Sequence, residues 1–290
     1  MKICVIGSLN IDYIGKSKYD LIRGESHPGT IKVNPGGVAR NIVENLGRMN
    51  LDVTFITAIG NDYYGILYKK ELEELNVKIM MPLNSSDYPT STYFAINNKN
   101  GNMEYAIVNT DIINLIEINY LSKKIEFLNT FDFIILDTNL NKNTLRFLFE
   151  NLKVKIIVDT VSLIKSEKII DYLDKIYLLK TNEAEYNHLR KYLESKKPLH
   201  LIKTSGNKSI LYYHNDSVKE YNPIKKEKIV STTGAGDALL SGVIYGLSQK
   251  LNLEEAINIG LLFSYYTLDV EETVNKNINS LINRHFSDSV

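Results

Sequence analysis

The sequence predicts a three-layer α/β fold, with a mainly parallel sheet between two layers of helices and a small β-rich lid. Short apolar runs that are typical of buried strands alternate with segments whose apolar residues recur at helical spacing. This alternation is typical of a parallel sheet that is covered on both faces. With 290 residues, the chain is long enough for one large domain, which we expect to span residues 1–290.

The first half of the chain shows the alternation clearly. The expected elements are strands at residues 2–7 and 53–59 and helices at residues 39–49 and 64–75. Asp62 stands directly before the second helix and is its expected N-cap.

The alternation is interrupted at residues 89–109. Two β-like runs, 91–96 and 103–108, are joined by a polar connection that contains Gly101, which predicts a hairpin. We interpret this hairpin as a lid over the functional site, paired with the chain at about residues 13–32. A hairpin at the edge of the main sheet is the alternative.

The second half returns to alternating strands and helices. The expected strands are residues 133–136, 155–158, 176–179, 200–202 and 209–213, and the expected helices are 141–152, 253–268 and 278–286. A further strand is expected to end at Ile229-Val230, directly before a glycine-rich turn.

Composition narrows the class of protein. Net charge is zero and the pI is near 7, which argues against a surface for nucleic acids or anionic membranes. The single cysteine, Cys4, lies in an apolar run, so we expect a core residue and no intrachain disulfide. No apolar run approaches the length of a membrane span. These features predict a soluble cytoplasmic protein.

The run Thr233-Gly234-Ala235-Gly236-Asp237 marks the start of a predicted helix. Glycines let the backbone approach a ligand, and free N–H groups at a helix start attract an anion. Asp237 would repel a resting phosphate there, so it makes more sense as a base that takes a proton from a hydroxyl. The alternative is a tight turn with an acidic residue in the first turn of the helix.

A second glycine turn, Gly36-Gly37, precedes the helix that carries Asn41. Paired glycines can admit a ligand at this helix start. Asn10 and Asp12 follow the first strand, where the ligands of open parallel sheets lie. Their side chains are candidates to bind hydroxyl groups, and an Asx turn is the alternative.

Asn182 and Glu185 are spaced to share one face of a helix. An amide and a carboxylate beyond a strand end can order the waters around a magnesium–phosphate complex. A solvated helix start is the alternative interpretation.

Taken together and in this order, these motifs resemble the ribokinase-like (PfkB) family of carbohydrate and nucleoside kinases, over essentially the full chain. They are Asn-x-Asp, Gly-Gly-x-x-x-Asn, a β-rich lid, Asn-x-x-Glu and Thr-Gly-Ala-Gly-Asp. Within the family, residues 26–41, 8–12 and 159–162 are most similar to pseudouridine kinases.

The resemblance implies a role for each motif at the acceptor. Asp237 would be the general base for the 5′-hydroxyl, and Gly234, Ala235 and Gly236 would form the anion hole for the γ-phosphoryl group. The residues implied to hold the acceptor are Asn10, Asp12, Gly36, Gly37 and Asn41. The product would be pseudouridine 5′-phosphate.

On the nucleotide side, the resemblance implies ATP and Mg²⁺. Asn182 and Glu185 would handle Mg²⁺ and phosphate, with Glu185 acting through water, and Thr204, Gly206 and Thr233 would contact the nucleotide. Ser231 stands where many members carry an Asp that helps bind a monovalent cation, so K⁺ activation is not implied for this chain.

Two other functions stay open from the sequence. One is a kinase of the same family for ribose, adenosine or fructose, because motifs that hold ribose do not report on the base. Tyr93 and Tyr105 of the lid are candidates to stack on a base. The other is a non-catalytic sensor on the same scaffold. The lid hairpin also offers a surface for a homodimer, because a small exposed sheet needs cover.

Overall fold

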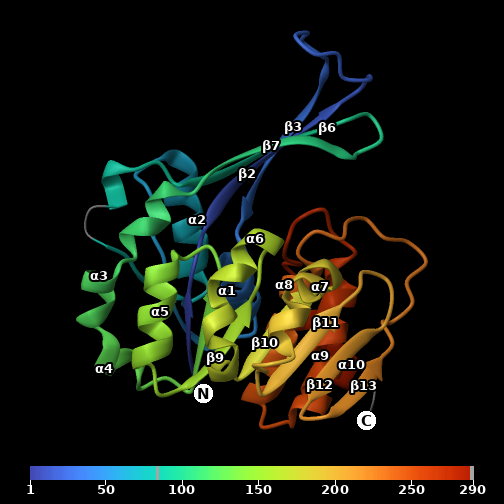
Figure 1. Ribbon diagram of the computed structural model, residues 1–290. Helices are drawn as coiled ribbons and strands as arrows, with labels where there is room; N and C mark the ends of the chain where they lie inside the picture. Colours follow the sequence, from blue (N-terminus) through green and yellow to red (C-terminus); the bar gives the residue numbers. More distant parts are fainter. Residues whose placement is uncertain (83–84, 288–290) are drawn as a thin grey trace.

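The computed structural model describes residues 1–82 and 85–287, and its described strands form two separate sheets (Figure 1). In the larger sheet the described strands are, in order across the sheet, β13 (Ser217–Tyr221), β12 (Ile210–His214), β11 (His200–Thr204), β10 (Leu178–Asn182), β9 (Lys155–Asp159), β8 (Phe133–Asp137), β1 (Lys2–Ile6), β4 (Asp52–Ile56) and β5 (Lys78–Met80). The strands from β11 to β5 pair in parallel, whereas β12 and β13 pair antiparallel. The predicted mainly parallel sheet is therefore confirmed.

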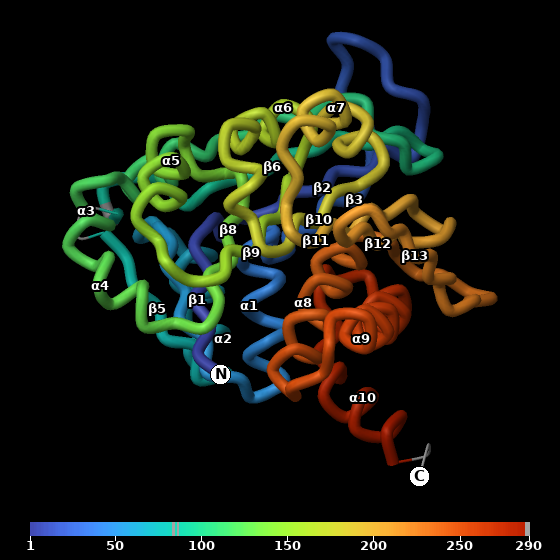
Figure 2. Tube along the Cα trace, turned by 60° about the horizontal axis from the view of Figure 1, so that its bottom comes forward, coloured from blue at the N-terminus to red at the C-terminus, as the bar shows by residue number. Residues whose placement is uncertain are grey.

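Helices cover both faces of this sheet, as Figure 2 shows. One face carries α1 (Val38–Arg48), α2 (Tyr63–Glu74), α8 (Ala235–Ser248) and α9 (Leu253–Thr267), against which α10 (Ile278–Ser287) packs. The other face carries α3 (Ile118–Ser122), α4 (Ile125–Leu128), α5 (Lys142–Asn151), α6 (Leu163–Ser166) and α7 (Glu183–Leu193). Short 3-10 turns, η1 (Ser85–Asp87), η2 (Asp111–Leu115) and η3 (Glu167–Lys175), complete the described helical elements.

Side chains that alternate along each strand build a core on each face of the sheet. Val5 of β1 packs in the core under α1 and α8, while its neighbours Cys4 and Ile6 pack in the core under α5 and α7. Because successive strand residues point to opposite faces, a strand buried on both sides reads as one continuous apolar run. Cys4 is fully buried, as predicted.

Polar side chains fix where several helices begin. Asp62 caps α2 by accepting a hydrogen bond from the Gly65 N–H at 2.8 Å, as predicted. Asn252 and Glu255 form a reciprocal capping box at the start of α9. These caps satisfy N–H groups that have no acceptor within the helix.

The small sheet consists of β3 (Gly29–Gly36), β2 (Asn10–Ser17), β6 (Ser91–Asn97) and β7 (Met103–Asn109), in that order across the sheet. Its outer pairs are antiparallel, and β2 pairs with β6 in parallel. The predicted hairpin at residues 91–108 is confirmed. The alternative of an edge hairpin in the main sheet is wrong, because β6 and β7 lie in the small sheet, above the carboxyl ends of the parallel strands (Figure 1).

Two predicted strands differ from the structure near the site. Ile229-Val230 does not end a strand, so this prediction is wrong: a loop leads into α8, and the Val230 N–H donates to the Leu268 carbonyl at 2.9 Å. The strand expected at residues 176–179 is shifted and runs over Leu178–Asn182, because its parallel partners β9 and β11 set its register. Consequently Lys180 lies within β10.

Among the described residues, no helix is long and apolar enough to cross a membrane.

The crossing of α8 and α9 yields a stability prediction. A Cβ on Gly242 would lie 2.7 Å from the Gly260 Cα and 2.8 Å from the Ile259 carbonyl oxygen, so the two backbones must separate if Gly242 is replaced. We expect Gly242→Ala to lower the free energy of unfolding by about 1–3 kcal/mol, measured by denaturant titration. Gly15→Ala is the control, because its Cβ would meet only the Ala95 carbonyl at 3.6 Å. Equal stability of the two variants would contradict the prediction.

Candidate active site

Polar residues gather where the parallel strands β8, β9, β10 and β11 end. Threonine hydroxyls link the neighbouring strand ends: Thr138 donates to the Thr160 carbonyl at 2.6 Å, and Thr204 donates to the Thr181 carbonyl at 3.2 Å. Thr160 in turn donates to the Glu185 carboxylate. These bonds fix the edge of the sheet on which the candidate residues stand.

Gly234 makes the turn that begins α8. It is the N-cap, with φ 81°, and a Cβ there would lie 2.0 Å from the Thr273 carbonyl oxygen. Only glycine fits both the backbone angle and the space. The Gly236 and Asp237 N–H groups that follow have no acceptor within the helix. The helix start is therefore built as the sequence predicted, with free donors beside a carboxylate.

Asp237 is 9% exposed and is held by the neighbouring helix α1. The Asn41 side-chain N–H donates to Asp237 Oδ2 at 2.8 Å. Asn41 Oδ1 accepts from the Thr273 hydroxyl at 2.9 Å and from Arg40 Nη1 at 3.1 Å, which fixes the orientation of the side-chain amide. Two predicted residues, far apart in sequence, thus meet in one hydrogen bond.

Burial raises the pKa of Asp237 to about 7, although the nearby Lys180 ammonium and the Asn41 hydrogen bond both act to lower it. These effects act in opposite directions on the pKa, because removal from water disfavours the ionised carboxylate, whereas a positive charge and a hydrogen-bond donor favour it. A carboxyl group with a pKa near neutrality is suited to accept a proton reversibly.

Asp12 lies on β2 rather than in a turn after the first strand. Its Oδ1 is buried and has no hydrogen-bond partner among the residues that the structure describes. Burial raises the pKa of Asp12 to about 6, while Arg40 acts to lower it. Buried polar atoms normally have a partner, so this oxygen is available to a ligand.

The second glycine turn packs around Asp12. A Cβ on Gly36 would lie 2.1 Å from Asp12 Oδ2, and Gly37 has φ 92° with the Ser8 carbonyl 2.5 Å from its would-be Cβ. Asn10 pairs with Gly36 in the small sheet and accepts a hydrogen bond from the Ser8 hydroxyl. The structure therefore brings Asn10, Asp12, Gly36 and Gly37 together.

Asn182 and Glu185 form a capping box at the start of α7. Asn182 Oδ1 accepts from the Glu185 N–H at 2.9 Å, and the Glu185 carboxylate accepts from the Asn182 N–H at 2.9 Å and from its amide at 2.8 Å. Glu185 is 3% exposed. Both of its oxygens are engaged, so the carboxylate is rigid.

The predicted nucleotide-side residues lie further along the same edge. Thr204 ends β11 beside Asn182, Gly206 follows in a turn with φ 62°, and Thr233 is exposed just before α8. Lys203 pairs with Glu183 at 3.8 Å.

The structure adds residues to which sequence reasoning gave no role. Asp137 and Asp159 are each 1% exposed at the ends of β8 and β9, and Lys180 lies beside them on β10. The repeated Asp-Thr after two apolar runs, Asp137-Thr138 and Asp159-Thr160, was the available signal. Arg40 and Thr273, which orient Asn41, carried no such signal.

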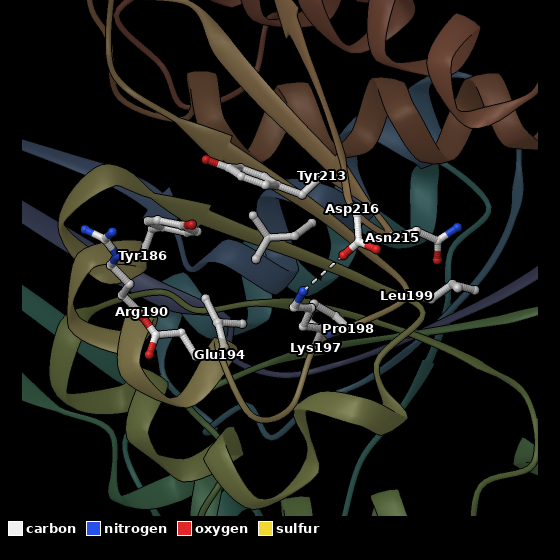
Figure 3. A pocket seen from close by; sticks show the side chains of 11 residues that line it. Tyr186, Arg190, Glu194, Lys197, Pro198, Leu199, Tyr213, Asn215 and Asp216 are labelled. Carbon is white, nitrogen blue, oxygen red and sulfur yellow. Dashed lines mark ion pairs between the residues drawn. The ribbon is translucent and has the colours of Figure 1, made fainter.

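A separate cleft of about 680 Å³ lies between α7 and the β12–β13 turn (Figure 3). Tyr186 and Tyr213 stack with ring centroids 5.5 Å apart at one side of it, and Lys197 pairs with Asp216 at 3.6 Å at the other. None of the predicted site residues lines this cleft.

The raised pKa of Asp237 predicts a dependence of stability on pH. A carboxyl group whose pKa is higher in the folded state than the ordinary 3.8 stabilises the fold below pH 4, and this contribution is lost as the pH rises through about 7. We therefore expect Asp237→Asn to gain stability relative to the wild type between pH 4 and 7, by a few kcal/mol at roughly 1.4 kcal/mol per pKa unit. Denaturant titrations at both pH values test this, and a difference that does not change with pH would contradict it.

Nearly the whole chain is similar to known kinases. Residues 1–278 match the family model described as pfkB family carbohydrate kinase. A pseudouridine kinase from Escherichia coli (strain K12) is 28% identical over 292 residues, covering 96% of this chain and 93% of that protein. A pseudouridine kinase from Arabidopsis thaliana is 24% identical over 280 residues, covering 91% of this chain and 69% of that protein.

A solved structure shares the fold. The structure of Arabidopsis thaliana ribokinase complexed with ribose and ATP aligns with a TM-score of 0.77 at 15% identity, covering 97% of this chain and 98% of that one. The three-layer arrangement with a separate small sheet is thus a ribokinase-like fold. Because the family model covers nearly the whole length, the chain belongs to the pfkB family of carbohydrate kinases and is a phosphotransferase that acts on an alcohol group.

Proposed function

We propose that the protein transfers the γ-phosphoryl group of ATP to the 5′-hydroxyl of pseudouridine, giving pseudouridine 5′-phosphate and ADP. The observation that carries the proposal is the Asp237 carboxylate, buried at the start of α8 beside free N–H groups and held by Asn41. In this proposal Asp237 is the proton acceptor and the neighbouring free N–H groups are the anion site, the two groups that phosphoryl transfer to an alcohol requires.

In the proposed reaction, Asp237 takes the proton of the 5′-hydroxyl. The hydroxyl oxygen forms a bond to the γ-phosphorus, and the bond from that phosphorus to ADP breaks. Of the three residues expected to form the anion hole, Gly234 and Gly236 are the proposed N–H donors to the charge that develops on the phosphoryl oxygens, whereas the Ala235 N–H already donates to the Thr232 carbonyl at 3.3 Å. The turn itself is half-buried, so each such contact would become stronger when closure of the lid removes water from it.

On the acceptor side, Asp12 supplies the unpartnered Oδ1 for a ribose hydroxyl. Asn10, Gly36 and Gly37 surround it, and the Gly36 backbone lies against the Asp12 carboxylate. The Asn41 side-chain N–H donates to Asp237, and its Oδ1 accepts from Thr273. We therefore propose that the main role of Asn41 is to position Asp237, and that contact with the acceptor is its second role.

Support for pseudouridine in particular comes from the two similar pseudouridine kinases and from the lid. Tyr93 stands opposite Asp12 in the small sheet, so the two side chains share one face. Tyr105 stands opposite Ile96, which places it on the other face and removes it as a candidate to stack on the base. We propose that Tyr93 is the aromatic residue nearest the base.

We propose that the small sheet is the lid of a single domain spanning residues 1–290. The lid extends beyond the predicted segments at about 13–32 and 89–109, since β2 begins at Asn10 and β3 ends at Gly36. Lys32 of β3 forms an ion pair with Glu271, which ties the sheet to the chain after α9. Closure would exclude water and so prevent hydrolysis of ATP.

Mg²⁺ would reach the protein through water. Within the described residues, no group of three His, Cys, Asp or Glu side chains is placed to hold a metal by itself. Glu185 has both oxygens hydrogen-bonded, which fits an outer contact to the hydrated ion, with Asn182 beside it. Mg²⁺ keeps several waters and binds substrate phosphates in such sites, and there it would neutralise phosphate charge. Thr204, Gly206 and Thr233 are the proposed contacts to the nucleotide.

We also propose a cytoplasmic location and no polymeric nucleic acid or membrane partner. The zero net charge supports the absence of such partners, because nucleic acids and anionic membranes attract basic surfaces. The single cysteine, Cys4, is buried and unpaired, which fits a reducing compartment.

The experiment that tests the function measures ADP release from MgATP with pseudouridine, uridine, adenosine, ribose and fructose. We expect a strong preference for pseudouridine, with kcat/KM rising to half its maximum near pH 7 as Asp237 loses its proton. Preference for ribose or another nucleoside would agree with the proposed phosphoryl transfer and would contradict pseudouridine as the acceptor. No release with any acceptor from folded protein would favour the sensor.

The role of Asp237 is tested by Asp237→Asn. We expect kcat to fall about 10²–10⁴-fold, because general base catalysis is lost while the side-chain shape is kept. The control is Asp216→Asn, whose side chain is fully exposed in the β12–β13 turn. A rate for Asp237→Asn near that of the wild type would show that Asp237 is not the base.

The outer face of the lid predicts a homodimer. Ile31, Phe94, Tyr105 and Ile107 share this face by strand register and are 38–73% exposed. An exposed apolar face beside the unpaired edge of β7 is typical of a protein–protein interface, and we propose that a second copy of the chain buries it. Light scattering should show a dimer that Ile107→Lys dissociates and Ile118→Lys on α3 does not. A wild-type protein that stays monomeric at high concentration would contradict the prediction.

A further inference from the structure

A buried carboxyl group joins the end of β8 to the end of β1 and the start of α1. It belongs to Asp137, which is 1% exposed. Its Oδ2 accepts hydrogen bonds from the Ser8 N–H at 3.0 Å and from the Ala39 N–H at 3.4 Å, and its Oδ1 accepts from the Asn139 N–H at 2.9 Å. One side chain therefore holds three segments of backbone, and the proposed reaction gives it no role.

The contacts of Asp137 suit an ionised carboxylate. Burial raises the pKa of Asp137, while the Ser8 and Asn139 donors and the nearby Lys165 ammonium of α6 act to lower it. Every hydrogen bond that Asp137 makes with the described residues is donated to it. A carboxylate accepts all of these bonds, whereas a protonated carboxyl group would add a buried O–H without an acceptor.

The start of α1 depends on this carboxylate because the helix carries no cap of its own. Its N-cap is Gly37, which makes no side-chain hydrogen bond, and the first turn contains no acidic residue. A helix start is stabilised by an acceptor for its free N–H groups and by a negative charge. Asp137 supplies both from the neighbouring strand, through its bond with the Ala39 N–H.

The backbone at the end of β1 packs directly on Asp137. A Cβ on Gly7 would lie 2.5 Å from Asp137 Oδ2 and 2.6 Å from the Ala39 Cβ, so a side chain does not fit between β1, β8 and α1. This close approach gives the carboxylate little freedom to move. The positions of Ser8 and of the start of α1 are thus set together.

Ser8 connects the carboxylate to the residues that are expected to hold the acceptor. Its hydroxyl donates to Asn10 Oδ1, and its carbonyl oxygen accepts from the Arg40 N–H at 3.3 Å. The same oxygen would lie 2.5 Å from a Cβ on Gly37, so it lines the second glycine turn. Within the described part of the chain, the hydrogen bonds of Asp137 and Ser8 do not reach the residues proposed to contact the nucleotide.

We propose that Asp137 is a positioning residue for the acceptor, which holds Ser8 and the start of α1 and through them fixes Asn10 and Gly37. This rests on the proposed kinase reaction, in which Asp137 neither contacts the acceptor nor exchanges a proton. Asp237 remains the base. The carboxylate of β8 thus sets the place of the acceptor side of the site and leaves the nucleotide side unaffected.

The first test is the kinetics of Asp137→Asn, with MgATP and the one of the five acceptors that the wild type uses best. The amide keeps the shape of the side chain but turns an NH₂ group toward backbone N–H donors. We expect kcat/KM for the acceptor to fall about tenfold or more, as for loss of a hydrogen bond to a charged group. KM for MgATP at saturating acceptor should change less than about threefold, a split that general destabilisation would not produce.

Hydrogen exchange of the protein without substrate tests the same contacts directly. In Asp137→Asn we expect the amides of residues 7–10 and 37–41 to exchange about tenfold faster or more, because their acceptor is lost. The matched control is Asp132→Asn. Asp132 is exposed and accepts from the Lys2 N–H at 2.7 Å, at the other end of β1, so this variant should change neither the kinetics nor exchange at these residues.

Ser8→Ala tests the connection from its other end if Asp137→Asn does not fold. It keeps the backbone bond to Asp137 and removes the hydroxyl bond to Asn10, so kcat/KM for the acceptor should fall about fivefold with KM for MgATP unchanged. Equal changes for acceptor and MgATP, wild-type kinetics of Ser8→Ala, or unchanged exchange in Asp137→Asn would overturn the proposal. A wild type that phosphorylates no acceptor would contradict the proposed function instead, and the exchange result would still decide whether Asp137 positions these residues.

Discussion

The constraint on which the site depends is the burial of the Asp237 carboxyl group at a helix start. A carboxylate in so dry a place is costly unless donors and a positive charge face it. The Asn41 amide and the Lys180 ammonium meet this need from α1 and from β10. The residual cost leaves the pKa of Asp237 near 7, where a carboxyl group can exchange a proton during turnover.

Parallel topology explains how so many charged groups share one edge of the sheet. Strands β8, β9, β10 and β11 all end at this edge, so Asp137, Asp159, Lys180 and Thr204 lie along it although long stretches of chain separate them. Threonine hydroxyls tie the strand ends together, which makes the edge rigid. Preorganised groups of this kind need little rearrangement when charge develops in a reaction.

The two faces of the small sheet carry different kinds of side chain. Asp12 and Tyr93 stand on one face by register, while Phe94 and Ile107 stand on the other. Side-chain alternation along β6 thus separates the face that carries Asp12 from an apolar face within one thin element. The ion pair between Lys32 and Glu271 connects this sheet to the chain that follows α9.

The sequence by itself determined much of the fold, because local patterns carry it. Apolar periodicity predicted the parallel sheet, its helices and the separate hairpin. Gly234 and Gly37 marked two turns, and in the structure each has a positive φ and no space for a Cβ, so only glycine fits there. It also singled out Asp237, Asn41, Asp12 and Glu185. Their types and spacing are local information.

Tertiary structure alone decided how those residues act on one another. The hydrogen bond from Asn41 to Asp237 joins α1 to α8, and the ion pair between Lys180 and Asp159 joins neighbouring strands. Register placed Lys180 inside β10 and turned Tyr105 away from Asp12, and neither follows from composition or spacing. A pKa is set by burial and by charges that arrive from distant parts of the chain, so the chemistry of Asp237 exists only in the folded protein.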